Sequence, residues 1–371
     1  MRKDAWVLPV VVCLAGCVTV RGVDGSEGEG DPDSRYVSVN PDDVKIVTSD
    51  IDNFWRAYDE STPEDGPRIF QDEYLARGSE GLREFARLKI GNAANLVSSI
   101  WNHWHYYASV RSSTLAIQSQ ERRIRESFRK LKELYPDALF PNVYFLIGTM
   151  HSGGISVDKG LIIGAELFCE TQSSPLDELN EWERSVVQPV DKIPVVVAHE
   201  LAHYEQRFEK APESLLDRSI AEGEADFLSQ LIAGAQINEL QHRYGAQHEE
   251  EVWNEFRFAM YGTDYSRWLY NGGELAAKGE PITRPADLGY YVGYKICEAF
   301  YDRAEDKKKA VKEMLEIRDF KQFLQESGYG MRFSAAARVT GQPVASGIAA
   351  DSIAHGNMDE SAARIVKLSG H

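Results

Sequence analysis

The sequence predicts an α+β protein that is mainly helical and contains a small mixed sheet. Two long stretches, residues 79–135 and 195–300, carry apolar residues at helical spacing, and the first of them contains no proline. Two short apolar segments that begin or end in glycine, 143–148 and 160–164, predict strands between these stretches. We therefore expect helices to form most of the fold and strands to come mainly from the middle of the chain.

The composition describes a folded, acidic protein. Of the 371 residues, 43% are hydrophobic and 27% are charged, which is typical of a globular chain. The formal charge is -17, from 58 acidic and 41 basic side chains, so binding to a nucleic acid is not expected. No run of 18 or more apolar residues occurs, which excludes a protein that crosses a membrane many times.

The first residues predict secretion and a lipid anchor. A basic start at residues 1–3 is followed by a short apolar stretch at 5–14, typical of a secretory signal peptide. Residues 14–17, Leu-Ala-Gly-Cys, resemble the lipobox of bacterial lipoproteins, which implies removal of residues 1–16 and acylation of Cys17. An ordinary signal peptide with a chance cysteine is the alternative. Because Val18 is not aspartate, the resemblance favours the outer over the inner membrane of the cell envelope.

The rest of the chain divides into three parts. Residues 17–43 are rich in glycine and acidic residues and predict a flexible tether. Residues 44–330 contain the apolar patterns and predict the folded domain. Residues 331–371 contain few large apolar side chains beyond the first positions and predict a loosely ordered tail.

Several elements of the domain can be placed. Residues 44–47 predict a first strand, and Asp50 is expected to cap the helix that follows it. The strands at 143–148 and 160–164 could pair as a broad hairpin around the break at Gly153 and Gly154.

Two cysteines remain in the mature domain, Cys169 and Cys297. In an oxidising periplasm they could form one disulfide. Two separate buried thiols are the alternative.

Residues 199–203, His-Glu-Leu-Ala-His, carry the clearest chemical signal. His199 and His203 are four positions apart and therefore lie on one helix face, where both can bind one zinc ion at about 2.0–2.1 Å. Glu200 is about 100° round the helix, beside the metal, where it can take a proton from zinc-bound water. A helix with two core histidines is the alternative, but the apolar stretch from Ile193 favours a buried active-site helix.

A catalytic zinc ion needs a third protein ligand and one open position. Glu222 follows at a suitable distance, and Asp226 shares its helix face, where it can accept the free N–H of His199. Glu224 is the competing ligand but points to a different face from Asp226. A solvated acidic helix face is the alternative for the whole cluster, although apolar neighbours oppose it.

The histidine motif followed by Glu-x-x-x-Asp resembles the gluzincin metallopeptidases. More closely, the chain resembles a bacterial domain-of-unknown-function family of predicted Zn-dependent proteases, many of them lipoproteins, over roughly residues 45–330. The segments that carry the resemblance are 147–154, 160–164, 199–206, 222–227 and 289–295.

The resemblance implies a zincin-like metallopeptidase domain with one catalytic zinc ion. By position, His199, His203 and Glu222 match the metal ligands, Glu200 matches the general base, and Asp226 matches the acid that holds a ligand. It also implies that an edge strand from the 143–168 region lines the active-site cleft and binds a polypeptide substrate. Tyr291 or Tyr290 could stabilise the oxyanion, although aromatic residues at helical spacing are more often core.

The sequence therefore predicts a zinc-dependent peptidase, anchored to the membrane of a bacterial envelope, with Glu200 as the general base. The alternative is a non-catalytic envelope lipoprotein that keeps the zincin fold as an assembly or binding partner. A metal-dependent hydrolase acting on a non-peptide amide is a third class. The sequence identifies no protein partner.

Overall fold

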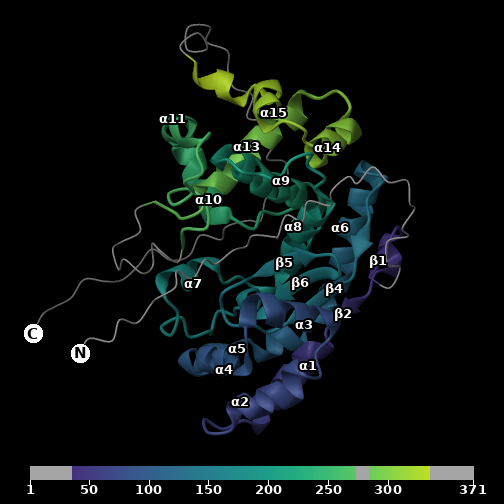
Figure 1. Cartoon of the computed structure of the whole chain (residues 1–371), viewed down its shortest axis with the longest axis vertical. Coiled ribbons are helices and arrows are strands. Elements are labelled where there is room, and N and C mark those ends of the chain that lie inside the picture. The colour runs from purple at the N-terminus through teal and green to yellow at the C-terminus, as the bar shows by residue number, and fades with distance from the viewer. Residues whose placement is uncertain (1–35, 273–283, 335–371) are drawn as a thin grey trace, which may run out of the picture. The chain divides into compact units, whose positions relative to one another are not determined.

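Four strands form a mixed sheet in the computed structural model, which describes residues 36–272 and 284–334 (Figure 1). Their order across the sheet is β2, β4, β6 and β5. The bounds are Ile46–Val47 (β2), Val143–Leu146 (β4), Gly154–Val157 (β5) and Gly160–Gly164 (β6). A separate antiparallel pair joins β1 (Val37–Ser38) to β3 (Phe140–Pro141).

The predicted hairpin of residues 143–148 with 160–164 is wrong in its pairing. β4 runs parallel to β6, with Val143 opposite Leu161. The hairpin partner of β6 is β5, which runs antiparallel to it with Ile155 opposite Ile162. The sequence did not predict β5, because this strand is only four residues long. It also begins with Gly154 directly after Gly153, and glycines weaken a strand pattern. β5, which lies within the 143–168 region named from the sequence, is the edge strand beside the candidate site.

The helices of the first half of the chain cover one face of the sheet (Figure 1), where α1 and α3 contact β4. The elements of this group are α1 (Ser49–Glu60), α2 (Gly66–Ile69), η2 (Phe70–Leu75), α3 (Glu80–Phe85), η3 (Ala86–Ile90), α4 (Ala93–Asn102) and α5 (Trp104–Leu115). Their core is largely aromatic, and Phe54 of α1 has ring contacts with Trp55, Phe70 and Tyr74. The last helix of the first half, α6 (Glu121–Leu134), instead packs on α8 and α9. The helical prediction for residues 79–135 is confirmed.

Asp50 does not cap α1, as the sequence suggested. It lies inside the helix and is fully buried, and its carboxylate accepts hydrogen bonds from the main-chain N (2.9 Å) and the hydroxyl (2.5 Å) of Ser79. Ser79 is itself the N-cap of α3. Asp50 therefore fixes the start of a second helix instead of its own, which a local sequence pattern could not indicate.

The other face of the sheet is covered by α8, which contacts β5 and β6 and packs in turn on α9 (Figure 1). The helices of this half are α7 (Glu181–Val186), α8 (Ile193–Glu205), α9 (Leu215–Ala233), α10 (Glu239–Gln247), α11 (Glu249–Ala259), α13 (Leu288–Arg303), α14 (Lys307–Leu315) and α15 (Phe320–Ser327). The α+β class is confirmed. Within residues 36–272 and 284–334, no helix is both long and apolar enough to cross a membrane.

Cys169 and Cys297 are both buried and free, so the disulfide considered from the sequence is not formed. They belong to different environments, because the charge of Glu166 acts on Cys169 and that of Glu224 acts on Cys297. The signal peptide, the lipidated Cys17 and most of the predicted tether and tail lie outside the described residues. Those boundaries stay predictions.

Candidate metal centre

Two adjacent helices, α8 and α9, supply the candidate metal ligands. α8 has Pro194 in its first turn, where the fixed φ of proline suits a helix, and all of its side chains are buried. α9 starts at a capping box formed by Ser214 and Asp217 and ends at Gly234, whose φ of 81° is in the left-handed region. These end signals fix the length of α9 and therefore the position of its acidic residues.

The structure brings His199, His203 and Glu222 together as one buried cluster. His203 Nε2 lies 3.1 Å from His199 Nε2 and 3.1 Å from Glu222 Oε2, and His199 Nε2 lies 3.8 Å from Glu222 Oε2. Bonds of 2.0–2.1 Å at tetrahedral angles would place ligand atoms about 3.4 Å apart. The three atoms are therefore close enough together for one metal ion to bind all of them, and zinc as that ion stays a prediction.

The charges of the cluster stabilise one another despite burial. Burial opposes a charge on His203, but the neighbouring Glu222 carboxylate more than offsets this and raises the pKa of His203 to about 10. Burial also opposes a charge on Glu222, yet His203 and His199 hold the pKa of this carboxyl below its ordinary value. The carboxylate thus stays ionised in the interior, where a positive partner is needed.

Asp226 lies where the sequence placed it, behind His199. Its Oδ1 is 3.0 Å from His199 Nδ1. Burial would raise its pKa, but hydrogen bonding to His199 and His242 lowers it instead. Asn238 Nδ2 also donates to both carboxylate oxygens, at 2.8 and 3.1 Å. Asn238, just before α10, and His242 within it were missed from the sequence, because only the folded chain brings them to α9.

Glu200 lies against β5, close enough to the ligand cluster for the charges of His199, His203 and Glu222 to act on its carboxyl. It is fully buried, and neither carboxylate oxygen has a hydrogen-bond partner among the described residues. Burial raises its pKa. The side chain lies directly on Gly154, where an added Cβ would be 2.5 Å from Glu200 Oε1. The glycine of the edge strand is therefore required for Glu200 to occupy this position.

Glu224, the competing ligand, is buried but lies outside the cluster. Its Oε2 accepts a hydrogen bond from Gln206 Nε2 at 3.3 Å, and burial raises its pKa well above the ordinary value. The choice of Glu222 over Glu224 therefore agrees with the geometry.

Tyr290 and Tyr291, the two tyrosines considered from the sequence, lie in different surroundings. Tyr290 is buried and stacks on His199, with ring centroids 6.4 Å apart. Tyr291 packs edge-on against His242, with ring centroids 5.7 Å apart, and its assignment to the site stays a prediction. The hydroxyl that reaches a ligand belongs to Tyr270, which donates to Glu222 Oε1 at 2.7 Å. Tyr270 has a φ of 57° and carries no sequence signal that links it to the motif.

The fold and the site define an α+β protein with a buried cluster of two histidines and a glutamate that could hold a metal ion. A family model described as gliding motility protein GldB matches residues 43–331. The chain belongs to this family of gliding motility lipoproteins. No curated protein and no solved structure matches the chain.

This family membership corrects the assignment made from the motifs. The resemblance to gluzincins and to predicted Zn-dependent proteases is wrong as a family assignment, because the matching family is one of gliding motility and not of proteases. The prediction of peptide-bond hydrolysis is overturned with it, and so is the description of the chain as a protease. The His-Glu-x-x-His spacing places two possible metal ligands on one face of a helix. The same spacing suits a catalytic and a non-catalytic site, so it does not identify a reaction. The predicted association with the cell envelope agrees with a lipoprotein family.

Proposed function

We propose that this chain is a lipid-anchored protein of the bacterial cell envelope that acts as a binding or assembly partner in the gliding machinery. The observation that carries this proposal is the family match, which extends over residues 43–331 and therefore includes the sheet, the metal-binding cluster and the helices around it. The non-catalytic alternative stated from the sequence fits this family better than hydrolysis does.

The proposal includes a zinc ion held by His199, His203 and Glu222, with Asp226 fixing the tautomer of His199. When bound, zinc would cross-link α8 to α9. The ligand side chains are at most 5% exposed, which favours a stabilising role over contact with a large substrate. In this view the zincin-like arrangement, a two-histidine helix beneath an edge strand, serves as a scaffold for binding.

The anchor is proposed to be the acylated Cys17, in the outer membrane. Several acyl chains on one residue hold a protein far more firmly than one chain does. Replacing Cys17 with alanine should leave the chain in the soluble periplasmic fraction. Continued partitioning of Cys17→Ala into membranes would remove the anchor from the proposal.

The test compares zinc content with rescue of gliding in a strain that lacks the protein. Wild type and Glu200→Gln should each hold one zinc ion per chain and should each restore gliding, because Gln keeps the shape of the side chain. His199→Ala should lose zinc and unfold at lower temperature. His105→Ala removes a histidine whose side chain is 76% exposed, and it serves as the matched control.

Three outcomes would contradict parts of the proposal. A Glu200→Gln chain that keeps its zinc and stability but fails to restore gliding would show that the carboxylate has a chemical task. Absence of zinc in the wild type after reconstitution would contradict the proposed zinc site. A folded wild-type chain that does not restore gliding would contradict the proposed role in gliding.

A further inference from the structure

A buried glutamine, Gln206, lies at the point where the chain leaves α8. It is the C-cap residue of this helix, with φ −60° and ψ 126°. Its side chain is 4% exposed and reaches α9, where Nε2 donates to the main-chain oxygen of Ala221 at 2.7 Å. The next residue, Arg207, donates its main-chain N–H to the Leu315 oxygen at 2.7 Å. The backbone on one side and α9 on the other therefore fix the place of the Gln206 side chain.

The contacts of Gln206 also determine which way its amide points. The main-chain oxygen of Ala221 can only accept a hydrogen bond, so it must face the NH₂ end of the amide. The same nitrogen lies 3.3 Å from Glu224 Oε2, a second acceptor. The amide oxygen, Oε1, is thereby left to face His203 Nδ1, which is 3.0 Å away. The opposite orientation would bring two acceptor oxygens together at Ala221.

This orientation determines which ring nitrogen of His203 keeps its proton. An amide oxygen only accepts, so Nδ1 must donate its N–H to Gln206. The other nitrogen, Nε2, is the one in the ligand cluster, 3.1 Å from Glu222 Oε2. A metal ion needs the free electron pair of that nitrogen, and any proton on it leaves when the metal binds. The hydrogen bond to Gln206 therefore suits the form of His203 that binds a metal ion.

The two histidines of the cluster are held by different kinds of side chain. The Asp226 carboxylate lies 3.0 Å from His199 Nδ1. His203 has a neutral amide in the corresponding place, and that amide comes from the same helix, one turn later. Groups in this position orient a ligand and raise its affinity for the metal ion.

We infer that Gln206 is the positioning residue of His203: its amide keeps the proton on Nδ1 and thereby leaves Nε2 to the metal ion. Ala221 and Glu224 of α9 hold that amide in place. This inference rests on the metal site of the proposed function. It gives α9 a second task there, because the helix that carries Glu222 also fixes a ligand of α8 through Gln206.

The first measurement is the zinc affinity of the mature, detergent-solubilised lipoprotein, by competition with a chromophoric chelator. Gln206→Leu removes both the acceptor and the donors of the amide, and its affinity should fall about 10- to 100-fold. Gln206→Glu keeps an acceptor oxygen of the same reach for His203 and should lose less affinity than Gln206→Leu.

The second measurement is proton–nitrogen NMR of the same chain made with isotope-labelled histidine. In the wild type the Nδ1 proton of His203 should be protected from exchange with water, with and without zinc, because Gln206 accepts it. The proton should lose this protection in Gln206→Leu and keep it in Gln206→Glu. His203→Ala identifies the signal. A role for Gln206 in packing alone would leave this proton unchanged.

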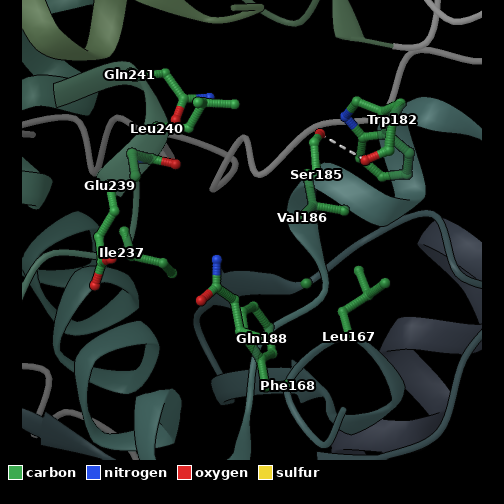
Figure 2. A pocket seen from close by; sticks show the side chains of 12 residues that line it. Leu167, Phe168, Trp182, Ser185, Val186, Gln188, Ile237, Glu239, Leu240 and Gln241 are labelled. Carbon is green, nitrogen blue, oxygen red and sulfur yellow. Dashed lines mark hydrogen bonds between the residues drawn. The ribbon is translucent and has the colours of Figure 1, made fainter. Parts of the chain in front are cut away.

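Gln188→Leu is the matched control. Gln188 is half-buried and lines a cavity of about 60 Å³ between α7 and the start of α10, and Figure 2 shows its amide directed into this gap. Its main chain pairs with Leu167 and Glu170, so the side chain can change while the backbone stays in place. The same substitution here should alter neither the zinc affinity nor the His203 proton.

An unchanged zinc affinity in Gln206→Leu, or an equal loss in Gln206→Leu and Gln188→Leu, would overturn the inference. A protected His203 proton in Gln206→Leu, or an unprotected one in Gln206→Glu, would overturn it too. If Gln206→Leu does not fold, the metal-free wild type decides, since rapid exchange of its His203 proton contradicts the hydrogen bond to Gln206. Absence of zinc in the wild type contradicts the proposed zinc site instead, because the proton is measured without the metal.

Discussion

Gly293 of α13 lies directly on the main chain of Ser219 in α9: an added Cβ would be 1.6 Å from the Ser219 carbonyl oxygen. The contact is reciprocal, since a Cβ on Gly223 would be 2.0 Å from the Tyr294 nitrogen. Two glycines therefore let the backbones of α9 and α13 touch. Because α9 carries Glu222 and Asp226, this crossing sets where both carboxylates lie relative to α8.

Gly293→Ala should force α13 away from α9. The methyl group meets main-chain atoms that cannot rotate aside, so we expect a loss of more than about 3 kcal/mol in the free energy of unfolding. Urea unfolding followed by circular dichroism measures this, and zinc content should fall in parallel. Gly262→Ala is the control, because its Cβ would meet only the Ala259 oxygen at 3.3 Å. Equal stability of the two variants would show that the crossing is adjustable.

Asp226→Asn should weaken zinc binding by about 10- to 100-fold. The neutral amide holds the His199 N–H less firmly and presents a donor where Asn238 already donates. Competition with a chromophoric chelator measures the affinity. Glu183→Gln is the matched control, since it removes a buried carboxyl whose partners, Asn180 and His103, lie outside the ligand cluster. A larger effect from Glu183 than from Asp226 would contradict the ligand assignment.

Glu166 should make the protein less stable as the pH rises from about 4.5 to about 7. Burial raises the pKa of this carboxyl from 4.5 to about 7. Between these values the folded chain keeps a proton that the unfolded chain has released, so stability falls by up to about 3 kcal/mol across the window and is level above it. Below about pH 4.5 both states are protonated and the full stability remains.

Glu166→Gln tests this pH dependence, because glutamine does not titrate. The variant should lose this part of the slope between urea midpoints at pH 5 and pH 8. It should also be less stable at pH 5, since the two carboxyl oxygens accept from the main-chain nitrogens of Gly148 and Met150 and glutamine has one acceptor oxygen. An unchanged slope would assign the titration to another buried acid.

Cys169 and Cys297 should behave as two protected thiols. Both are buried, and burial raises the pKa of each thiol, so the reactive thiolate is scarce. The native mature chain should not react with a thiol reagent at pH 8. Denaturant without reductant should expose two reactive groups. A reaction that required prior reduction would reveal a disulfide and contradict the structure.

The sequence predicts those parts of the site that helix periodicity determines. His199 and His203 face the same way because they are one turn apart, and the same holds for Glu222 and Asp226. The convergence of the two pairs follows from their buried, apolar helices. Local spacing could therefore predict the ligand cluster and the residue behind it.

The rest depends on contacts between remote segments. Tyr270 reaches Glu222 from a position 48 residues later, and Asn238 reaches Asp226 from the start of another helix. β4 and β6 pair in parallel because β5, which lies between them in the sequence, is at the edge of the sheet on the far side of β6. This short glycine-led strand gave no sequence pattern. Function was the least predictable part, because the same ligand pair suits a reaction and a scaffold.

The parallel pairing of β2 with β4 also governs how the chain can reach its folded state. Lys45, next to β2, donates its main-chain N–H to the Asn142 side chain 97 positions later. The first strand can complete its pairing only when a segment that follows much later in the chain has reached it. Such high contact order slows folding and leaves the apolar strands unpaired for longer than in a protein built from local hairpins.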